Sequence, residues 1–280
     1  MSLAEQISNE LWACHLSVVP YNEALATQQH ICRRRQAGEL PDMLLLLEHP
    51  PVYTCGRRAD AGELPLGETF YRSKGIDVHA TDRGGKVTYH GPGQLVGYPI
   101  VRIDDVGAYL RTMEDALIAA LAEVGIAAGS RHGEGIDYTG VWVDERKIAS
   151  IGVHVSRGVT THGFAINFDN DLEPFSWVVA CGLPDVTMTS VARELVGADG
   201  ARELDAVRGA NGAPNTPGGC ESLSCFRRRV AHNFARAFGR RQRLVTPARL
   251  GIDTANPTPR ASGRALRKTS PSPAAEPVPA

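Results

Sequence analysis

The sequence predicts an α/β protein of the α+β kind, in which a largely antiparallel mixed sheet is flanked by helices in a single domain. Residues 105–126 place apolar side chains at helical spacing, as do residues 21–38 and 223–239. Residues 139–168 instead hold three apolar or alternating segments separated by two short polar turns, which is typical of an antiparallel three-stranded meander. Helices and hairpins are therefore interleaved along one chain.

The other elements follow from shorter patterns. The helix Tyr21–Gly38 has an apolar stripe and a glycine at its expected end. A short apolar run, Met43–Glu48, stops at Pro50–Pro51 and predicts a buried strand. We further expect, in chain order, strands at 75–83 and 94–103 and, within 170–195, a short helical turn, a loop and a helix.

Composition limits the class of protein. The 280 residues carry a formal net charge of −1, and 42% of them are hydrophobic and 22% charged. This is typical of a globular domain in water, and the balanced charge argues against nucleic acid or an anionic membrane as a partner. Residues 1–19 resemble neither a signal peptide nor a membrane span, so we expect a cytoplasmic protein. Nothing in the sequence demands more than a monomer.

Two stretches fall outside the expected core. We predict one folded domain over residues 1–252. Within it, residues 197–219 are rich in Gly, Ala, Asn and Pro, which predicts a mobile insert. Residues 253–280 are rich in Pro, Ser, Ala and Arg, which predicts a disordered tail.

The loop Asp82–Leu95, with the sequence DRGGKVTYHGPGQL, packs flexibility and rigidity into a short stretch. It is not a phosphate loop, because Gly85-Lys86 is followed by Val87 rather than Ser or Thr and no helix comes next. A tight turn between strands is one interpretation. The other is a pocket wall, because Tyr89 and His90 sit on a backbone that glycine lets a ligand approach closely, and we expect both to face the reacting centre.

The chain has six cysteines, and without an export signal we expect them to be reduced. Cys220 and Cys225 with His232 are spaced too loosely to indicate a zinc site, and no metal is expected. Cys181 follows an apolar run, which favours a core position. However, Gly182 and Pro184 indicate a loop, where a thiol could serve as a nucleophile if it had a partner.

Lys147 is one of four lysines and is a candidate partner for Cys181. It is either solvated after the Asp144–Arg146 turn or directed along the buried face of an apolar strand. In the second case its ammonium would stabilise a thiolate, since two unit charges ~4 Å apart attract by roughly 4 kcal/mol at an effective dielectric near 20. His90, His154 and His162 leave a cysteine–histidine pair open as the alternative.

Four ordered blocks resemble the lipoyl(octanoyl) transferase family. They are LLLLEHPPVYTCGRR from residue 44, RGGKVTYHGPGQLVGYPI from residue 83, KIASIGVHVSRGVTTHGFAINF from residue 147, and CGLPDVTMTSV from residue 181. The resemblance covers roughly residues 16–238. It implies the fold of the biotin and lipoate ligases, a cysteine thioester intermediate, and no ATP, metal or other cofactor.

The resemblance also assigns residues and partners. Cys181 matches the nucleophile and Lys147 its partner. The expected donor is octanoyl-acyl carrier protein, and the acceptors are the lipoyl domains of 2-oxoacid dehydrogenase E2 subunits and the glycine-cleavage H protein. The positions that match the acyl pocket are Arg83, Gly84, Gly85, Lys86, Val87, Thr88, Tyr89, His90, Ser150, Ile151, Gly152, Gly163, Phe164 and Ala165.

Three alternatives share features with this interpretation. An ATP-dependent lipoate or biotin ligase on the same fold would not depend on Cys181. An amidotransferase would move acyl groups between two lipoyl domains. A protein that only binds an acyl chain or a carrier protein would have no use for a nucleophile.

Overall fold

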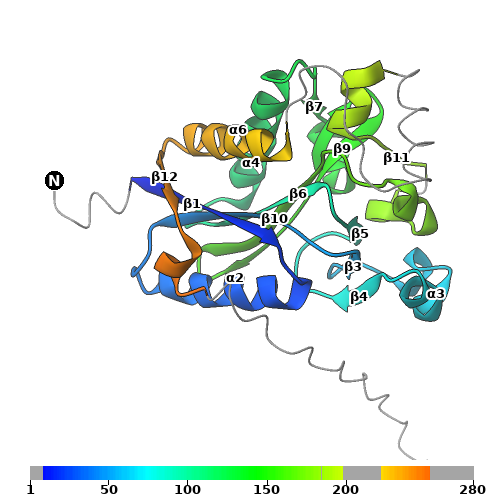
Figure 1. Cartoon of the computed structure of the whole chain (residues 1–280), viewed down its shortest axis with the longest axis horizontal. Coiled ribbons are helices and arrows are strands. Elements are labelled where there is room, and N and C mark those ends of the chain that lie inside the picture. The colour runs from blue at the N-terminus through cyan, green and yellow to red at the C-terminus, as the bar shows by residue number, and fades with distance from the viewer. Residues whose placement is uncertain (1–8, 184, 198–221, 253–280) are drawn as a thin grey trace, which may run out of the picture.

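The structure, a computed structural model, describes residues 9–183, 185–197 and 222–252 (Figure 1). Its helices are α2 (Tyr21–Gln36), α3 (Gly67–Ser73), α4 (Val106–Ala122) and α6 (Leu223–Ala237), and residues 191–197 are also helical. Its strands are β1 (Glu10–Val18), β2 (Asp42–Glu48), β3 (Val52–Cys55), β4 (Asp77–Ala80), β5 (Val87–His90), β6 (Gln94–Ile100), β7 (Gly129–Ser130), β8 (Gly140–Val143), β9 (Arg146–Ser156), β10 (Val159–Asn167), β11 (Thr187–Met188) and β12 (Arg241–Val245).

A nine-stranded sheet runs through the molecule in the order β12-β1-β2-β6-β10-β9-β8-β7, with β11 paired to β9. The pairs from β2 through β6, β10, β9 and β8 to β7 are antiparallel, whereas β1 pairs in parallel with both β2 and β12. This agrees with the predicted α/β class and its largely antiparallel mixed sheet.

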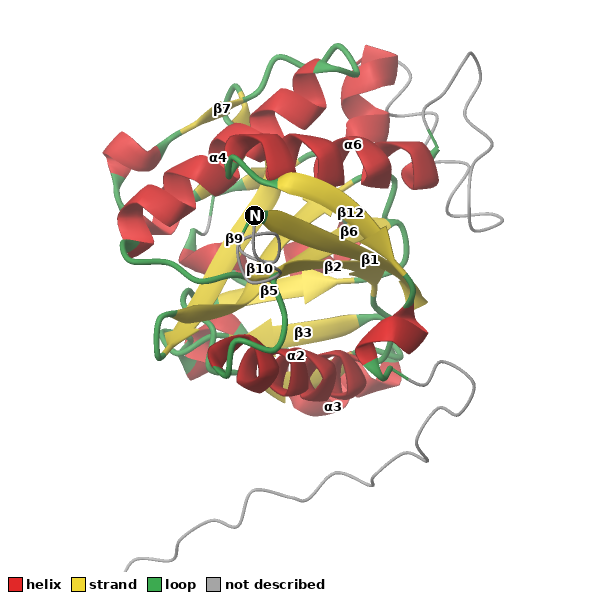
Figure 2. Ribbon diagram, turned by 90° about the vertical axis from the view of Figure 1, so that its left-hand side faces the viewer, coloured by secondary structure: helices red, strands yellow, loops and turns green. Residues whose placement is uncertain are grey.

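Helices cover both faces of this sheet (Figure 2). Helices α4 and α6 lie on one face, where Met113, Leu117, Phe226 and Phe234 are fully buried in the larger hydrophobic core. Helix α2 lies on the other face and buries Ala24, Ile31 and Cys32 against leucines of β2. The apolar stripes of these helices are therefore the surfaces that close the two cores.

A second sheet, in the order β4-β3-β5, lies beside the first. Its core is aromatic: the rings of Tyr53 and Tyr71 meet edge to face at 4.9 Å, and Tyr89 packs against Tyr53 and Phe175. The segment that carries Cys181 also packs here, through Val178 and Ala180.

The predicted helices and the meander are confirmed. Both hairpin turns of the meander contain residues with positive φ, Asp144 (50°) in one and Arg157 (49°) and Gly158 (73°) in the other, as tight two-residue turns require. Several elements are not predicted from the sequence. Residues 87–90 of the predicted loop form strand β5, and the strands β1, β3, β7 and β12 and the helix α3 lie where no element is expected.

The predicted insert and tail fall mostly outside the structure. Of the insert only Gly197 is described, and the whole tail, residues 253–280, lies beyond the described part. Within the described ranges, no helix combines the length and apolar character that crossing a membrane requires.

Candidate functional site

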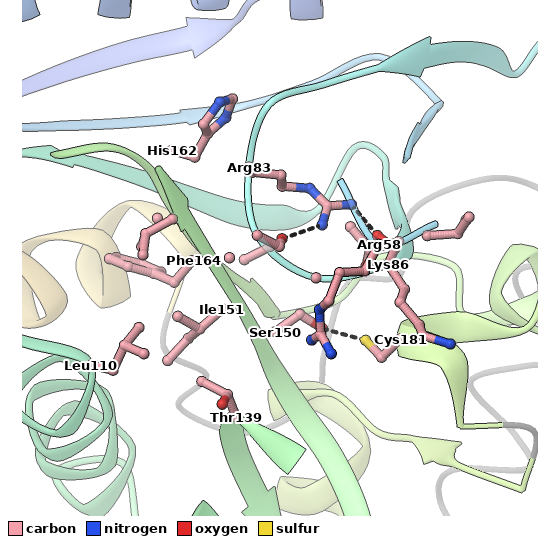
Figure 3. Close-up of a pocket in the computed structure, with 18 of the residues that line it drawn as sticks. Arg58, Arg83, Lys86, Leu110, Thr139, Ser150, Ile151, His162, Phe164 and Cys181 are labelled. Carbon is pink, nitrogen blue, oxygen red and sulfur yellow. Dashed lines mark hydrogen bonds between the residues drawn. The ribbon is translucent and has the colours of Figure 1, made fainter. Parts of the chain in front are cut away.

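A pocket of about 220 Å³ opens where β9 and β10 meet the glycine segment that leads into β5 (Figure 3). Figure 3 shows Cys181, Ser150 and Lys86 on one side of it and Leu110, Ile151 and Phe164 on the other. Of the predicted site residues, all but Tyr89 line this pocket, namely Arg83, Gly84, Gly85, Lys86, Val87, Thr88, His90, Lys147, Ser150, Ile151, Gly152, Gly163, Phe164, Ala165 and Cys181.

Cys181 lies on the pocket wall in a strained conformation. It sits in a single 3₁₀ turn, Ala180–Gly182, with φ 56° and ψ 13°, the left-handed region that L-residues other than Asn and Asp rarely adopt. The turn closes through the Gly182 N–H, which donates to the Val179 carbonyl. The half-buried sulfur lies 3.7 Å from Ser150 Oγ. Strain of this kind is often found where a side chain must be aimed at a reactive site.

Lys147 reaches the same pocket from β9. Strand β11, which follows Cys181 closely in the chain, pairs in parallel with β9 so that Met188 is opposite Lys147, and the Thr189 N–H donates to the Lys147 carbonyl. This pairing brings the Cys181 segment alongside the lysine. The Lys147 side chain is only 2% exposed, so of the two positions that the sequence left open the structure shows the buried one.

Arg83 organises the glycine segment. Its guanidinium is buried and donates to the Thr54 hydroxyl and to the carbonyls of Thr54, Gly84 and Lys86. The Gly84 N–H donates to the Val153 carbonyl, which fastens the segment to β9. Arg83 therefore shapes the wall of the pocket, because its donors are already used by the backbone that forms that wall.

Gly152 permits this close docking. A Cβ at Gly152 would lie 2.8 Å from the Gly84 carbonyl oxygen, closer than carbon and oxygen approach each other in folded proteins. Glycine at position 152 is thus required by the approach of the glycine segment to the strand.

Strand β5 divides its side chains between two environments. Thr88 and His90 lie on the pocket, whereas the ring of Tyr89 packs among the aromatic residues of the second sheet. Successive side chains of a strand point to opposite faces, so residues 88, 89 and 90 cannot all face one pocket. The expectation that Tyr89 faces the reacting centre is therefore not met.

The three histidines proposed as bases have other partners. His90 contacts Gln94 Oε1 through Nδ1 at 2.7 Å and the Thr54 hydroxyl through Nε2 at 3.4 Å. His162 Nε2 lies 2.7 Å from Asp82, and His154 Nε2 lies 3.6 Å from the same carboxylate. In the described part of the chain, none of these histidines bonds to Cys181. The cysteine–histidine alternative therefore loses its structural support.

Burial governs the charge of the two histidines that line the pocket. It lowers the pKa of His90 well below its usual range. It also lowers the pKa of His162, against the opposing attraction of the Asp82 carboxylate. Both rings are accordingly neutral near pH 7, and the cations that share the pocket with Cys181 are Arg58, Arg83, Lys86 and Lys147.

Charged and apolar side chains surround the mouth of the pocket. Lys86 Nζ lies 3.1 Å from Glu63, and this hydrogen bond raises the pKa of Lys86. Arg58 reaches Asp137 at 2.8 Å, joining the segments on two sides of the opening. Val106 and Ile136 line the pocket and are also exposed, so the rim carries apolar surface as well.

Several pocket residues were not predicted. Val106 and Leu110 are four residues apart on α4, the spacing of neighbours on one helical face. Whether this face of α4 lines a pocket depends on where the helix lies over the sheet, and the sequence alone does not predict that position. The remaining additions are Tyr21, Arg58, Tyr98, Ile136, Asp137, Thr139, Val153 and His162, which had been considered only as a base.

Among residues 9–183, 185–197 and 222–252, no group of three or more His, Cys, Asp or Glu side chains is arranged to hold a metal ion. Cys220, one member of the loosely spaced zinc candidate, lies outside these ranges.

The fold is that of the lipoate-protein ligases. Lipoate-protein ligase A bound with ATP superimposes with a TM-score of 0.64 at 17% identity, over 85% of this chain and 89% of that one. A bipartite lipoate protein ligase from Thermoplasma acidophilum, described with its E2 lipoyl domain, gives a TM-score of 0.60 at 22% identity, over 86% and 87%. At such identities the likeness establishes the fold alone.

The family follows from the sequence matches. The lipoyl protein ligase A/B catalytic domain matches residues 20–206, and the chain belongs to this family. It is 50% identical over 182 residues to the octanoyltransferase of Rubrobacter xylanophilus, covering 64% of this chain and 80% of that protein. It is 46% identical over 207 residues to the octanoyltransferase of Mycobacterium marinum, covering 70% and 82%. These relatives confirm the predicted enzyme class, an acyltransferase.

Proposed function

We propose that this protein transfers an octanoyl or lipoyl group from acyl carrier protein to the target lysine of lipoyl domains, through a thioester on Cys181. This would be the first step of endogenous lipoate biosynthesis. The observation that carries the proposal is the placement of Cys181: its sulfur lies on the wall of a pocket that also holds the buried Lys147. The names of the curated relatives support octanoyl as the group transferred.

The first half-reaction loads the enzyme. The Cys181 thiolate attacks the carbonyl carbon of the octanoyl thioester on the carrier, and a tetrahedral oxyanion forms. The Lys147 ammonium supplies N–H donors to this oxyanion. The bond between the carbonyl carbon and the carrier sulfur then breaks, and the departing thiolate takes a proton from Lys147. The products are octanoyl-Cys181, a carrier thiol and a neutral Lys147.

The second half-reaction transfers the octanoyl group from Cys181 to the acceptor lysine. The amine of the acceptor lysine attacks the carbonyl carbon of octanoyl-Cys181, and an amide forms as the carbon–sulfur bond breaks. The amine passes its proton to the neutral Lys147, which restores the ammonium beside the released thiolate. We assign this proton to Lys147, not His90, because both ring nitrogens of His90 already contact Gln94 and Thr54.

The walls of the pocket suit an acyl chain. Leu110, Ile151 and Phe164 present apolar surface along one side of the pocket. Burying about seven carbons at roughly 0.8 kcal/mol each would contribute on the order of 5–6 kcal/mol to binding. The volume of about 220 Å³ lies below the roughly 300–1,000 Å³ usual for drug-sized ligands, as a slim chain requires.

The partners of the reaction are proteins. The proposed acceptors are the lipoyl domains of 2-oxoacid dehydrogenase E2 subunits and the glycine-cleavage H protein. The proposal includes a monomeric enzyme in the cytoplasm, as the sequence predicts, with one folded domain over residues 1–252. It involves no nucleic acid, no membrane and no cofactor.

One experiment tests nucleophile, donor and ATP independence together. The full-length chain is incubated with octanoyl-acyl carrier protein without ATP and its intact mass is measured, followed by addition of a lipoyl domain. We expect one octanoyl group on Cys181, its loss when the lipoyl domain is added, and no adduct on Cys181→Ser. Absence of an adduct on the wild-type chain would contradict the proposal.

Two related activities give different results. A ligase would modify the lipoyl domain only when ATP and a free fatty acid are supplied, and Cys181→Ser would retain that activity. An amidotransferase would load Cys181 from an octanoylated lipoyl domain or H protein in preference to the carrier. Competition between the two donors in the mass experiment separates this case from the proposed one.

A further inference from the structure

The Lys147 ammonium is buried without a carboxylate partner. The side chain is 2% exposed, yet among the described residues its charged end makes no hydrogen bond or ion pair. It does contact an aromatic ring: Nζ lies 5.1 Å from the centre of the Trp142 ring. A buried cation normally requires pairing, and among the described residues this ring is the group that attracts the charge.

The β8–β9 hairpin fixes the two side chains relative to each other. Trp142 is directly opposite Lys147 in the pairing, and the register shifts next to this pair, between Val141 and Trp142. Such irregularities often re-aim side chains beside functional sites. The lysine chain passes over Gly140, where a Cβ would lie only 2.8 Å from Lys147 Cε.

The indole is itself held firmly. Trp142 is 2% exposed, and its Nε1–H donates to the Tyr138 carbonyl at 2.9 Å. The Arg131 guanidinium also lies over the ring, 4.7 Å from its centre, and is ion-paired with Glu134 and Glu145. These contacts therefore fix the position of the Trp142 ring.

An aromatic face and a carboxylate would hold the lysine with different consequences. A carboxylate would accept hydrogen bonds from the ammonium and keep its donors occupied. A ring attracts the charge through its quadrupole and accepts no directed bond comparable to these, so the three N–H donors of the lysine stay available. Proton transfer and oxyanion stabilisation both require that the N–H donors of Lys147 are available.

We infer that Trp142 is a positioning residue for acyl transfer: its indole face holds the Lys147 ammonium at the pocket wall and leaves all three N–H donors free for the reacting acyl group. This inference rests on the proposed function, because it assigns Trp142 a role through the lysine of that reaction. Trp142 itself does not line the pocket.

Fluorination of the indole tests the inference without changing its shape much. Tryptophan at position 142 is replaced site-specifically by mono-, di-, tri- and tetrafluorotryptophan, and the rate of octanoyl transfer from carrier to lipoyl domain is measured. Each fluorine weakens the negative face of the ring, so we expect the rate to fall stepwise, about tenfold in all. The midpoint of thermal unfolding should stay constant across the series.

Trp177 provides a matched control, because its ring also contacts a lysine: Lys74 Nζ lies 5.7 Å from the ring centre. Neither Trp177 nor Lys74 lines the pocket. The same fluorinated series at Trp177 should leave the transfer rate unchanged. A flat series at Trp142, or an equal fall at Trp177, overturns the inference. If the wild-type chain transfers no octanoyl group at all, the proposed function fails and the inference with it; transfer combined with a flat series overturns the inference alone.

A double-mutant cycle separates positioning from simple packing. Trp142→Leu should slow acylation of Cys181 in the wild-type background and cause no further loss in the Lys147→Ala background. An equal loss in both backgrounds would show that the ring acts on the fold and not through the lysine.

Discussion

The Ser150 hydroxyl lies within hydrogen-bonding distance of the Cys181 sulfur. At 3.7 Å the contact is within the range of bonds to sulfur. A hydroxyl can donate to a thiolate and accept from a thiol, so Ser150 can stay bonded in both states of the nucleophile. Lys147 lines the same pocket from β9.

We expect Ser150→Ala to slow acylation of Cys181 about fivefold, because a hydrogen bond to the thiolate contributes roughly 1 kcal/mol. The measurement is the single-turnover rate of octanoyl loading, followed by intact mass. Ser156→Ala, at the far end of β9, is the matched control and should load at the wild-type rate. Equal rates for the two variants would exclude a role for the Ser150 hydroxyl.

At the scale of elements, the docking of the glycine segment on β9 shapes the pocket. The segment is held by Arg83 and by the bond from Gly84 to Val153, and it can come this close only because Gly152 has no side chain. The wall is therefore a property of two elements in contact and not of the loop alone.

Gly152→Ala should push the segment away from the strand. The added methyl would meet the Gly84 carbonyl oxygen at 2.8 Å, and neither backbone can yield easily. We expect a loss of about 1–3 kcal/mol in the free energy of unfolding and a higher KM for octanoyl-carrier protein. Gly129→Ala is the control, since a methyl there meets no atom within 4 Å. Equal stability of the two variants would contradict this account.

The elements that could be predicted from sequence are those with a long or repeated pattern. The α4 helix and the β8–β9–β10 meander have enough residues for their periods to be clear. Strand β5 has only four residues between glycine pairs, which is too short to distinguish from a loop. The sequence therefore predicts the wrong face for Tyr89.

The residues of the site could be predicted from the four family blocks, but their relations could not. That β11 pairs with β9 beside Lys147, and that the second sheet packs the Cys181 segment, depends on contacts between residues far apart in sequence. Trp142 gave no signal in sequence, because an aromatic residue in a buried strand is ordinary core.

At the scale of the whole molecule, buried histidines couple the fold to pH. His49 is fully buried between the Val19 carbonyl and the Tyr98 hydroxyl, each 2.6 Å away, and burial lowers its pKa to about 4. The rings of His49 and His90 lie 5.6 Å apart. The folded protein keeps these rings neutral at a pH where the unfolded chain would protonate them.

Stability should therefore fall as the pH drops from about 6.5 toward 4, because the unfolded state then binds more protons than the folded state. For His49 alone we expect a loss of about 2 kcal/mol between pH 7 and pH 5. Chemical denaturation at several pH values measures the slope, and His49→Gln should reduce it. His30→Gln, on the exposed side of α2, should not. A slope unaffected by His49→Gln would contradict the assignment.

Among the residues that the structure describes, those that line the pocket lie between Tyr21 and Cys181. We therefore expect removal of residues 253–280 to leave the rate of octanoyl transfer within about twofold of the full chain, a difference of no more than about 0.4 kcal/mol in activation free energy. The comparison uses carrier and lipoyl domain at concentrations below their KM values, where a lost docking contact would be visible. A large drop would assign the segment a role in binding a partner.

The left-handed backbone at Cys181 implies that the free energy of unfolding is lowered at the residue that supplies the nucleophile. A residue with a Cβ costs roughly 1–2 kcal/mol in this conformation, whereas glycine adopts it freely. Once the thiol is removed, Cys181→Gly should therefore be more stable than Cys181→Ala by about 1 kcal/mol, which paired melting curves would reveal. Such a result would mean that the wild-type chain is less stable than it could be because residue 181 must carry a thiol. A variant that relieves this backbone strain gains stability and loses the nucleophile.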